Sequence, residues 1–202
     1  MNTTIFDNLS NSLFDLHAHH PSRQGERVVE QDVDSLGVHP WHAADADVEE
    51  VMNKLCIRLQ NDENHRIAAI GECGLDKLCT VPFPQQMTIF RRHIAWSLRF
   101  RLPLIIHCVR AWNELLALRQ EYALPSGDVP WIVHGFRGKP ELMQQLLRAG
   151  FFVSFGFRHN INALRQCPPE RCYFETDTDP RSVTDLHRLI AYELEEKAED
   201  VN

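Results

Sequence analysis

Histidines and acidic residues are grouped in several short segments of this sequence. The segment LFDLHAHHP, residues 13–21, places His17, His19 and His20 directly after the start of an apolar run. Alternate side chains of a strand point to the same face, so His17 and His19 would project together, about 7 Å apart along the chain. Two such imidazoles can bind one metal ion, although an isolated H-x-H is more often a polar patch at a strand end. The other segments must decide between these interpretations.

Further possible metal ligands stand at the ends of later apolar runs. They are His39 in LGVHP, Glu72 in AIGECGLD, His107 in LIIHCVRA, His134 in WIVHGFRG, and Glu175 and Asp177 in FETD. Each has an ordinary alternative as a core histidine, a carboxylate paired with an arginine or, for Asp177, a helix cap. One metal site explains all of them at once, whereas the alternatives require a separate reason for each. The joint interpretation is therefore favoured.

Imidazole nitrogens and carboxylate oxygens are typical ligands of Zn²⁺, Mn²⁺ and related divalent ions, and Mg²⁺ is also compatible. The residues are sufficient for two ions. Two ions about 3.5–4 Å apart need a bridging ligand, and we predict Glu72 for that role. The predicted ligands of the first ion are His17, His19 and Asp177, and those of the second are His107 and His134. Water activated between two such ions is a nucleophile near neutral pH.

The elements that must position these residues alternate between strands and helices. Apolar runs predict strands at 13–17, 35–39, 67–72, 103–107, 131–134, 151–155 and 172–176. Helical periodicity predicts helices around 48–59, 87–98, 112–116, 142–147 and 183–194. This alternation is typical of a parallel sheet, and a chain with so many units most often closes into a β/α barrel. Because active sites form at the carboxyl ends of barrel strands, the candidate ligands are expected to meet there.

Composition narrows the class of protein. The 202 residues, 44% of them hydrophobic, fit one sizeable core and a single domain over residues 1–202. A formal net charge of -7 argues against a broad basic surface, so a phosphate-bearing substrate would need locally bound cations. Six cysteines without a C-x-x-C pair predict buried thiols in a reducing cytoplasm. With no recognisable signal peptide or membrane span, we expect a cytoplasmic protein without membrane contact or an obligate protein partner.

Taken in order, these segments resemble the motifs of the TatD family of metal-dependent deoxyribonucleases, within the wider amidohydrolase-like barrels. FDLHAHH is similar to the opening D-x-H-x-H motif, LGVHPWHA to the G-[IV]-H-P segment and AIGECGLD to the G-E-x-G-L-D segment. LIIHCVRA and VHGFRG resemble the two later histidine motifs, and ETD the terminal acidic motif. The resemblance implies metal ligands at His17, His19, Glu72, His107, His134 and Asp177. It also implies that His39 lies near the substrate phosphate.

Two segments depart from the family pattern. Family members usually have a β/α unit between the first two motifs, but residues 20–34 are too few for a strand and a helix. We therefore predict a distorted TIM-like α/β barrel of seven strands with the second β/α unit missing. After ETD, the segment TDPRSVTDLHRLIAYELEEKAEDVN replaces the usual continuation. The rim that binds substrate is expected to differ accordingly.

Two arginines and a tryptophan near these motifs are candidates for substrate contacts. Arg110 in HCVRA and Arg137 in HGFRG could bind phosphate. The alternatives are an ion pair between Arg110 and Glu114, four residues on, and a solvated loop position for Arg137. Trp41 could stack on a base or pack against the first helix.

Three classes of function are consistent with these residues. The first is a phosphodiesterase, namely a TatD-type deoxyribonuclease that acts at single-stranded DNA ends. The nucleophile would be a hydroxide between two metal ions, and Glu72, Asp177 and His39 would be catalytic. The second is an amide or lactone hydrolase, but many such relatives bridge their ions with a carboxylated lysine, and no lysine ends a predicted strand. The third is a non-catalytic metal-binding protein, against which the complete ligand set argues. We expect the first, with DNA or another phosphodiester as substrate.

Overall fold

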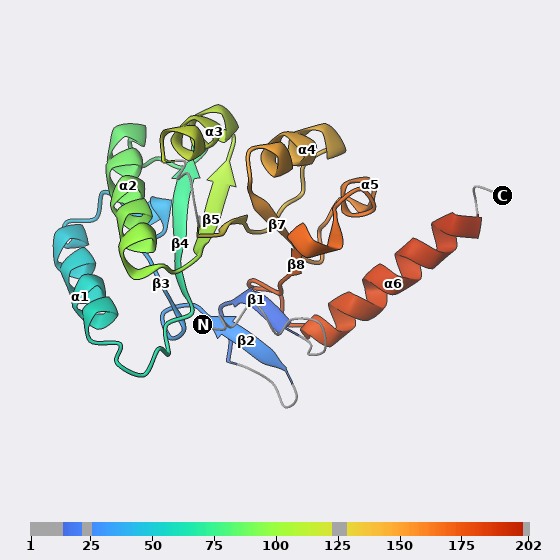
Figure 1. Cartoon of the computed structure of the whole chain (residues 1–202), viewed down its shortest axis with the longest axis horizontal. Coiled ribbons are helices and arrows are strands. Elements are labelled where there is room, and N and C mark those ends of the chain that lie inside the picture. The colour runs from blue at the N-terminus through green and yellow to red at the C-terminus, as the bar shows by residue number, and fades with distance from the viewer. Residues whose placement is uncertain (1–13, 22–25, 123–128, 200–202) are drawn as a thin grey trace.

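Parallel strands form two sheets in the computed structural model, which describes residues 14–21, 26–122 and 129–199. The six-stranded sheet has the order β3 (Ser35–Leu36), β4 (Ala69–Asp76), β5 (Leu104–Val109), β6 (Trp131–Val133), β7 (Phe152–Phe155) and β8 (Cys172–Phe174). The two-stranded sheet pairs β1 (Phe14–Ala18) with β2 (Arg27–Glu30). The fold is therefore the predicted α/β class with parallel strands in barrel order (Figure 1).

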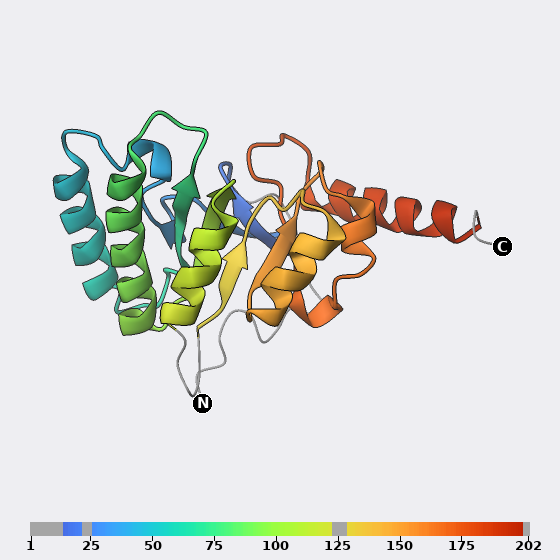
Figure 2. The same cartoon turned by 90° about the horizontal axis from the view of Figure 1, so that it is seen from above.

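The helices follow the strands in the expected alternation. They are α1 (Val48–Gln60), α2 (Phe83–Phe100), α3 (Trp112–Glu121), α4 (Pro140–Arg148), α5 (Ile161–Leu164) and α6 (Val183–Glu199), with short 3-10 helices η2 (Pro40–His42) and η3 (Pro169–Arg171). Periodicity predicted all of these helices except α5 and the 3-10 turns, which are too short to show a period. Helices α1 to α4 line the outer side of the six-stranded sheet, and α6 projects away from the strands (Figures 1 and 2). No helix among the described residues combines the length and apolarity needed to cross a bilayer.

Apolar side chains on both faces of the sheet explain why the strands are continuous apolar runs. Ile106 of β5 packs in a core shared with the helices, which includes Phe90 of α2 and Leu115 of α3. Its neighbour Ile105 lies in a second core with Ile132 and other residues of the strands. Because successive strand residues alternate between faces, one run supplies both cores.

The segment between the first two motifs shows that the prediction of seven strands was wrong, because the described residues form eight strands. Residues 27–30 form β2, parallel to β1, so the strand of the second unit is present. Only its helix is absent from the described residues, because the chain turns from β2 directly into β3 through an isolated bridge between Gln31 and Ser35. The sequence did not predict β2 because RVVE has only two apolar residues and shows no extended apolar run.

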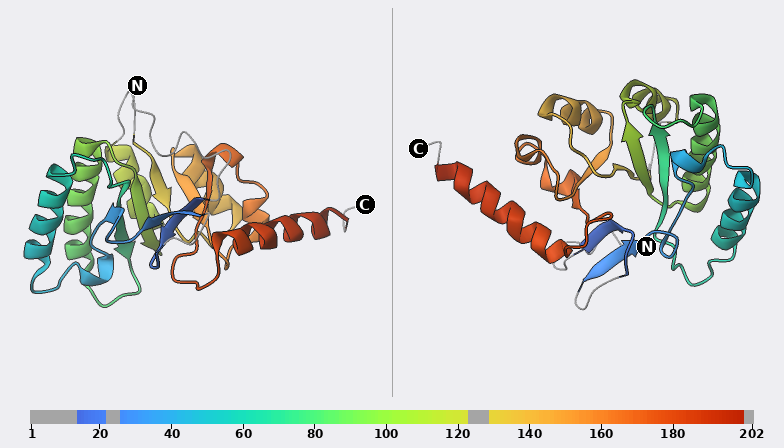
Figure 3. Two further views of the ribbon diagram at one scale, coloured as in Figure 1. Left: turned by 90° about the horizontal axis from the view of Figure 1, so that it is seen from below. Right: turned by 180° about the vertical axis from the view of Figure 1, so that it is seen from behind.

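The two sheets do not join into one closed barrel in the described part of the chain. The two-stranded sheet faces the concave side of the larger one, near its two ends (Figure 3). Near β8, the Asp177 N–H donates to the His17 carbonyl at 2.9 Å, and the His19 N–H donates to the Asp177 carbonyl at 3.0 Å. These bonds bring the end of β1 to the end of β8, as closure of a barrel would require.

Candidate metal centre

Glu72 lies within β4 at a bulge of the strand. Ile70 pairs with Leu104, but Cys73 pairs with Ile106, so one extra residue of β4 stands between these pairs. Both glycines of the GECG segment have positive φ, +143° at Gly71 and +146° at Gly74. A Cβ at Gly74 would lie 2.0 Å from the His107 carbonyl oxygen. The spacing of G-E-x-G therefore reflects a close approach of β4 to β5 on either side of the carboxylate.

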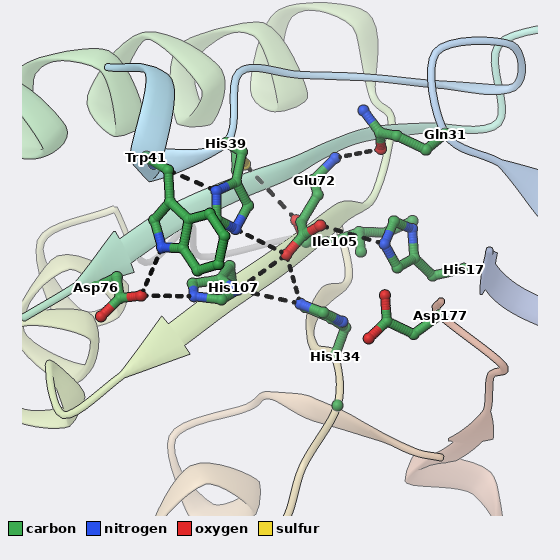
Figure 4. A network of polar contacts seen from close by, with 12 residues as sticks. His17, Gln31, His39, Trp41, Glu72, Asp76, Ile105, His107, His134 and Asp177 are labelled. Atoms are coloured by element: carbon green, nitrogen blue, oxygen red, sulfur yellow. Dashed lines mark hydrogen bonds and ion pairs between the residues drawn. The ribbon is translucent and has the colours of Figure 1, made fainter. Parts of the chain in front are cut away.

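Five imidazole nitrogens surround the Glu72 carboxylate, which is buried. Figure 4 shows those of His17, His39, His107 and His134. The Oε1 atom lies 2.7 Å from His134 Nε2, 2.9 Å from His107 Nδ1 and 3.3 Å from His39 Nε2. The Oε2 atom lies 3.3 Å from His17 Nε2 and 3.5 Å from His19 Nε2. Asp177 Oδ1 is 3.7 Å from His19 Nε2. The structure thus brings all six residues expected as metal ligands to one place.

Two groups of possible ligands share Glu72. His17 and His19 form one group with it, and His39 and His107 form the other, with the ligand atoms of each group within 4.8 Å of one another. A carboxylate common to two groups is the arrangement expected of a bridging ligand. His134 adjoins the second group through Glu72 Oε1.

The hydrogen bonds of His39 distinguish it from the other histidines. Its Nδ1 accepts the backbone N–H of Trp41 at 3.2 Å, so the neutral ring carries its proton on Nε2. Burial lowers the pKa of His39 and so favours this neutral form, although its contact with Glu72 acts in the opposite direction. A ring with a protonated Nε2 is a hydrogen-bond donor and not a metal ligand at that atom. A hydrogen-bond donor at this position is compatible with the phosphate contact that the sequence predicts for His39. In the structure, His39 Nε2 lies 3.3 Å from Glu72 Oε1.

His17 provides a test of whether a cation fits these residues. Its side chain is fully buried, and neither ring nitrogen has a hydrogen-bond partner among the described residues, although Nε2 is 3.3 Å from Glu72 Oε2. A buried imidazole without a partner costs free energy. One carboxylate also cannot satisfy five rings. Divalent cations bound by imidazole and carboxylate would satisfy both, so the residues fit such ions.

Charge is unevenly distributed in this cluster. Burial would raise the pKa of Glu72, but the charge of His134 and hydrogen bonds from His107 and His134 outweigh burial and hold this pKa well below its usual value. Burial would likewise lower the pKa of His134, yet the Glu72 and Glu175 carboxylates hold it well above its usual value. A hydrogen bond to Glu72 raises the pKa of His19. The cluster therefore favours the ionised form of Glu72 and the charged form of His134 and His19.

Two further carboxylates contact histidines that are candidate metal ligands. Asp76 Oδ2 lies 3.3 Å from His107 Nε2, which leaves His107 Nδ1 toward Glu72. Glu175 Oε1 lies 3.1 Å from His134 Nδ1 and accepts the Gly135 N–H at 2.6 Å, which leaves His134 Nε2 toward Glu72. A carboxylate on the far nitrogen of an imidazole sets its tautomer and ring orientation.

Several supporting residues were not predicted from the sequence. Asp76 belongs to the G-E-x-G-L-D segment, so that motif was the signal that could have identified it. Gln31 Oε1 accepts the Glu72 N–H at 2.7 Å across 41 positions of sequence, and no local pattern marks this residue. His93 Nε2 accepts the Val38 N–H at 3.0 Å, beside His39. These contacts join segments that are far apart in the chain.

The candidate metal centre opens into a cleft of about 1320 Å³. Arg110 and Arg137 are exposed, line this cleft and form no ion pair with a described residue. Glu114 instead pairs with Lys77 at 2.6 Å, so the alternative partner considered for Arg110 is engaged elsewhere. Acidic Asp45 and Asp47 also line the cleft, together with Asp32. The cleft therefore has both cationic and anionic walls.

Cys73 and Cys108 adjoin proposed ligands but face away from them. Both thiols are buried in the core shared with the helices, as expected for neighbouring strand positions. Burial raises the pKa of Cys108 to about 12, so its thiol remains protonated. Both cysteines pack in the core, in agreement with the buried thiols predicted from the sequence.

Comparison with known proteins identifies the family. A family model described as TatD related DNase matches residues 14–200. The 3'-5' RNA nuclease TATDN2 of Homo sapiens is 30% identical over 174 residues, 78% of this chain and 22% of that protein. The 3'-5' ssDNA/RNA exonuclease TatD of Pantoea ananatis is 30% identical over 174 residues, 77% of this chain and 63% of that protein.

A solved structure supports the same relationship. The crystal structure of a hydrolase of the TatD family from Entamoeba histolytica matches with a TM-score of 0.62 and 26% sequence identity, over 75% of this chain and 51% of that chain. The chain spans less than two thirds of the length of each of these relatives. Because the family model matches nearly all of the described residues, the chain belongs to the TatD related DNase family.

Proposed function

We propose that the chain is a metal-dependent hydrolase that cleaves phosphodiester bonds, acting as a deoxyribonuclease at single-stranded DNA ends with two divalent ions, Mg²⁺, Mn²⁺ or Zn²⁺. The observation that carries this proposal is the buried Glu72 carboxylate, whose two oxygens each contact a different pair of the histidines expected as metal ligands. Relatives with this family relationship are named as nucleases for single-stranded DNA or RNA. The bound ions would supply Lewis acidity toward water and the phosphate.

Side chains of this protein would hold the ions, accept the proton of the attacking water and contact the phosphate. Glu72 would bridge the two ions, and Asp177, which lines the cleft, would hold at its carboxylate the proton lost by the attacking water. The Nε2–H group of His39 would donate a hydrogen bond to a phosphate oxygen. Arg110 and Arg137 would contact further phosphate oxygens from the exposed side of the cleft.

We also propose the setting in which this activity takes place. Residues 1–202 would act as one hydrolase domain, without an obligate protein partner and without membrane contact, in the cytoplasm. All six cysteines are free thiols, which supports a reducing compartment.

A reconstitution assay tests the proposed reaction. Protein stripped of metal is reloaded with Mg²⁺, Mn²⁺ or Zn²⁺ and offered single-stranded DNA, single-stranded RNA, duplex DNA and a lactone. We expect nucleotide release from single-stranded DNA, weaker action on the duplex, and loss of release in Glu72→Gln. The matched control is Glu50→Gln, which makes the same change on exposed α1.

Two results would overturn the proposal. Lactone hydrolysis without phosphodiester cleavage under all three metals would assign the chain to the amide and lactone hydrolases. Metal binding without hydrolysis of any substrate would assign it to the non-catalytic class.

A further inference from the structure

One large aromatic side chain of the cleft, that of Trp41, is exposed to solvent but held in position by hydrogen bonds. Trp41 is 56% exposed and lines the cleft together with Glu72 and His107. The other exposed large hydrophobic side chains in the described part of the chain, Tyr192 and Leu78 among them, do not line it. The exposed surface of Trp41 therefore belongs to the cleft that leads to the metal centre.

The indole is held in place from two sides. Its Nε1–H donates to Asp76 Oδ2 at 2.8 Å, and Asp76 is itself buried, with Oδ1 accepting the Leu78 N–H at 2.7 Å. The backbone N–H of Trp41 donates to His39 Nδ1, and the two rings meet edge to face at 4.8 Å. The polar edge of the indole is thus satisfied within the protein (Figure 4). A ring fixed before binding loses little conformational entropy when a ligand stacks on it.

The position of this ring suits a base rather than a phosphate. The ring centroids of Trp41 and His107 are 6.4 Å apart, so a group on the indole lies beside the metal ligands. Asp45 and Asp47, which follow Trp41 in the chain and line the same cleft, would repel a phosphate there. A nucleobase is neutral and has an aromatic face that stacks on tryptophan.

We propose that Trp41 is a stacking platform for the terminal base of a single-stranded nucleic acid, and that Asp76 fixes the platform beside the metal centre. This inference rests on the proposed function, because the base on Trp41 belongs to the nucleotide whose phosphate is cleaved. Stacking of this kind tolerates any base, so the platform would select single strands with accessible ends rather than a particular sequence. In a duplex, the terminal base is paired and stacked on its neighbour.

The test compares Trp41→Ala, Trp41→Phe and wild type on two oligonucleotides that differ only in whether the terminal nucleotide carries a base. We expect Trp41→Ala to raise KM about tenfold on the complete oligonucleotide, with kcat and metal content nearly unchanged. Removing the terminal base should raise the KM of wild type by a similar factor, and the two changes together should add little. Trp41→Phe should retain most of the affinity, because it keeps an aromatic ring.

The control and a cleavage-independent measurement complete the test. Ile57→Ala removes a similarly exposed apolar side chain from α1, outside the cleft, and should leave KM unchanged. Binding of both oligonucleotides is also measured by fluorescence anisotropy with Glu72→Gln protein, alone and combined with Trp41→Ala. Weaker binding of the complete oligonucleotide upon Trp41→Ala, with binding of the abasic oligonucleotide nearly unchanged, would support the platform even if no variant cleaves DNA.

Two outcomes would overturn the platform while leaving the proposed reaction intact. The first is cleavage in which Trp41→Ala has the KM of wild type. The second is an equal loss on the complete and abasic oligonucleotides, which would indicate that Trp41 acts only on the structure of the site. A deoxyribose and a ribose version of each oligonucleotide show whether the stacked nucleotide comes from DNA or RNA.

Discussion

His19 and Asp177 contact each other through both backbone and side chain. The His19 N–H donates to the Asp177 carbonyl at 3.0 Å, and His19 Nε2 lies 3.7 Å from Asp177 Oδ1. The Asp177 N–H donates in turn to the His17 carbonyl at 2.9 Å. Candidate ligands from the two ends of the described chain are therefore placed by the backbone, independently of any charge on their side chains.

This arrangement predicts that the charge of Asp177 can be removed without unfolding the site. Asp177→Asn keeps both backbone bonds but loses an anionic ligand, so metal occupancy is expected to fall about tenfold or more. The melting temperature of the metal-free protein should change little. Metal analysis and thermal unfolding of the stripped protein measure the two effects. A large drop in that melting temperature would contradict the backbone argument.

The second prediction concerns Asp76, which contacts both His107 and Trp41. Asp76→Asn removes the charge that orients the His107 ring, so metal affinity should weaken by about 10–100-fold. Glu175→Gln is the matched comparison on His134 and should weaken affinity to a similar extent. Titration of metal into the stripped variants measures both. Wild-type affinity in Asp76→Asn would show that the contact with His107 has no orienting role.

The third prediction is a pH dependence of stability that arises at His93. Burial lowers the pKa of His93 from 6.5 to about 4 in the folded chain, where its ring accepts the Val38 N–H. The unfolded chain takes up a proton below pH 6.5 that the folded chain does not. The stabilising contribution is thus complete above pH 6.5 and is lost as the pH falls toward 4, by about 3 kcal/mol.

Denaturant unfolding of wild type and His93→Gln from pH 4 to pH 8 isolates this contribution. The free energy of unfolding of wild type should exceed that of the variant most at neutral pH, and the difference should shrink as the pH falls. Both proteins retain the histidines of the candidate metal centre. Titration of those histidines therefore does not contribute to the difference between the two free energies of unfolding. A difference that does not vary with pH would show that His93 titrates normally in the folded chain.

The fourth prediction uses salt to test the arginines of the cleft. If Arg110 and Arg137 each contact a phosphate, substituting either by alanine should reduce the slope of log affinity against log salt by about 0.7 for single-stranded DNA. Arg188→Ala, on exposed α6 and paired with Asp185, should leave the slope unchanged. Binding to Glu72→Gln protein at several salt concentrations gives these slopes. Equal slopes in wild type and all variants would show that neither arginine contacts a phosphate.

The sequence by itself determined the fold class and the residues that gather at the site. Strands such as LIIHCV are buried on both faces and therefore appear as continuous apolar runs, and amphipathic helices repeat at a recognisable period. Parallel strands place their carboxyl ends together, so a histidine or carboxylate in each motif was sufficient to predict convergence. These signals are local, because each depends on residues within one element.

Tertiary structure decided how the gathered residues divide their roles. Five rings around Glu72, the proton on His39 Nε2 and the paired contacts of Asp76 all depend on distances between different strands and loops. The strand β2 also depends on tertiary structure, because its four-residue sequence RVVE forms a strand by pairing with β1. Hydrogen bonds and ligand geometry are set by atoms brought together from distant parts of the chain, and a pattern within one segment does not contain those distances.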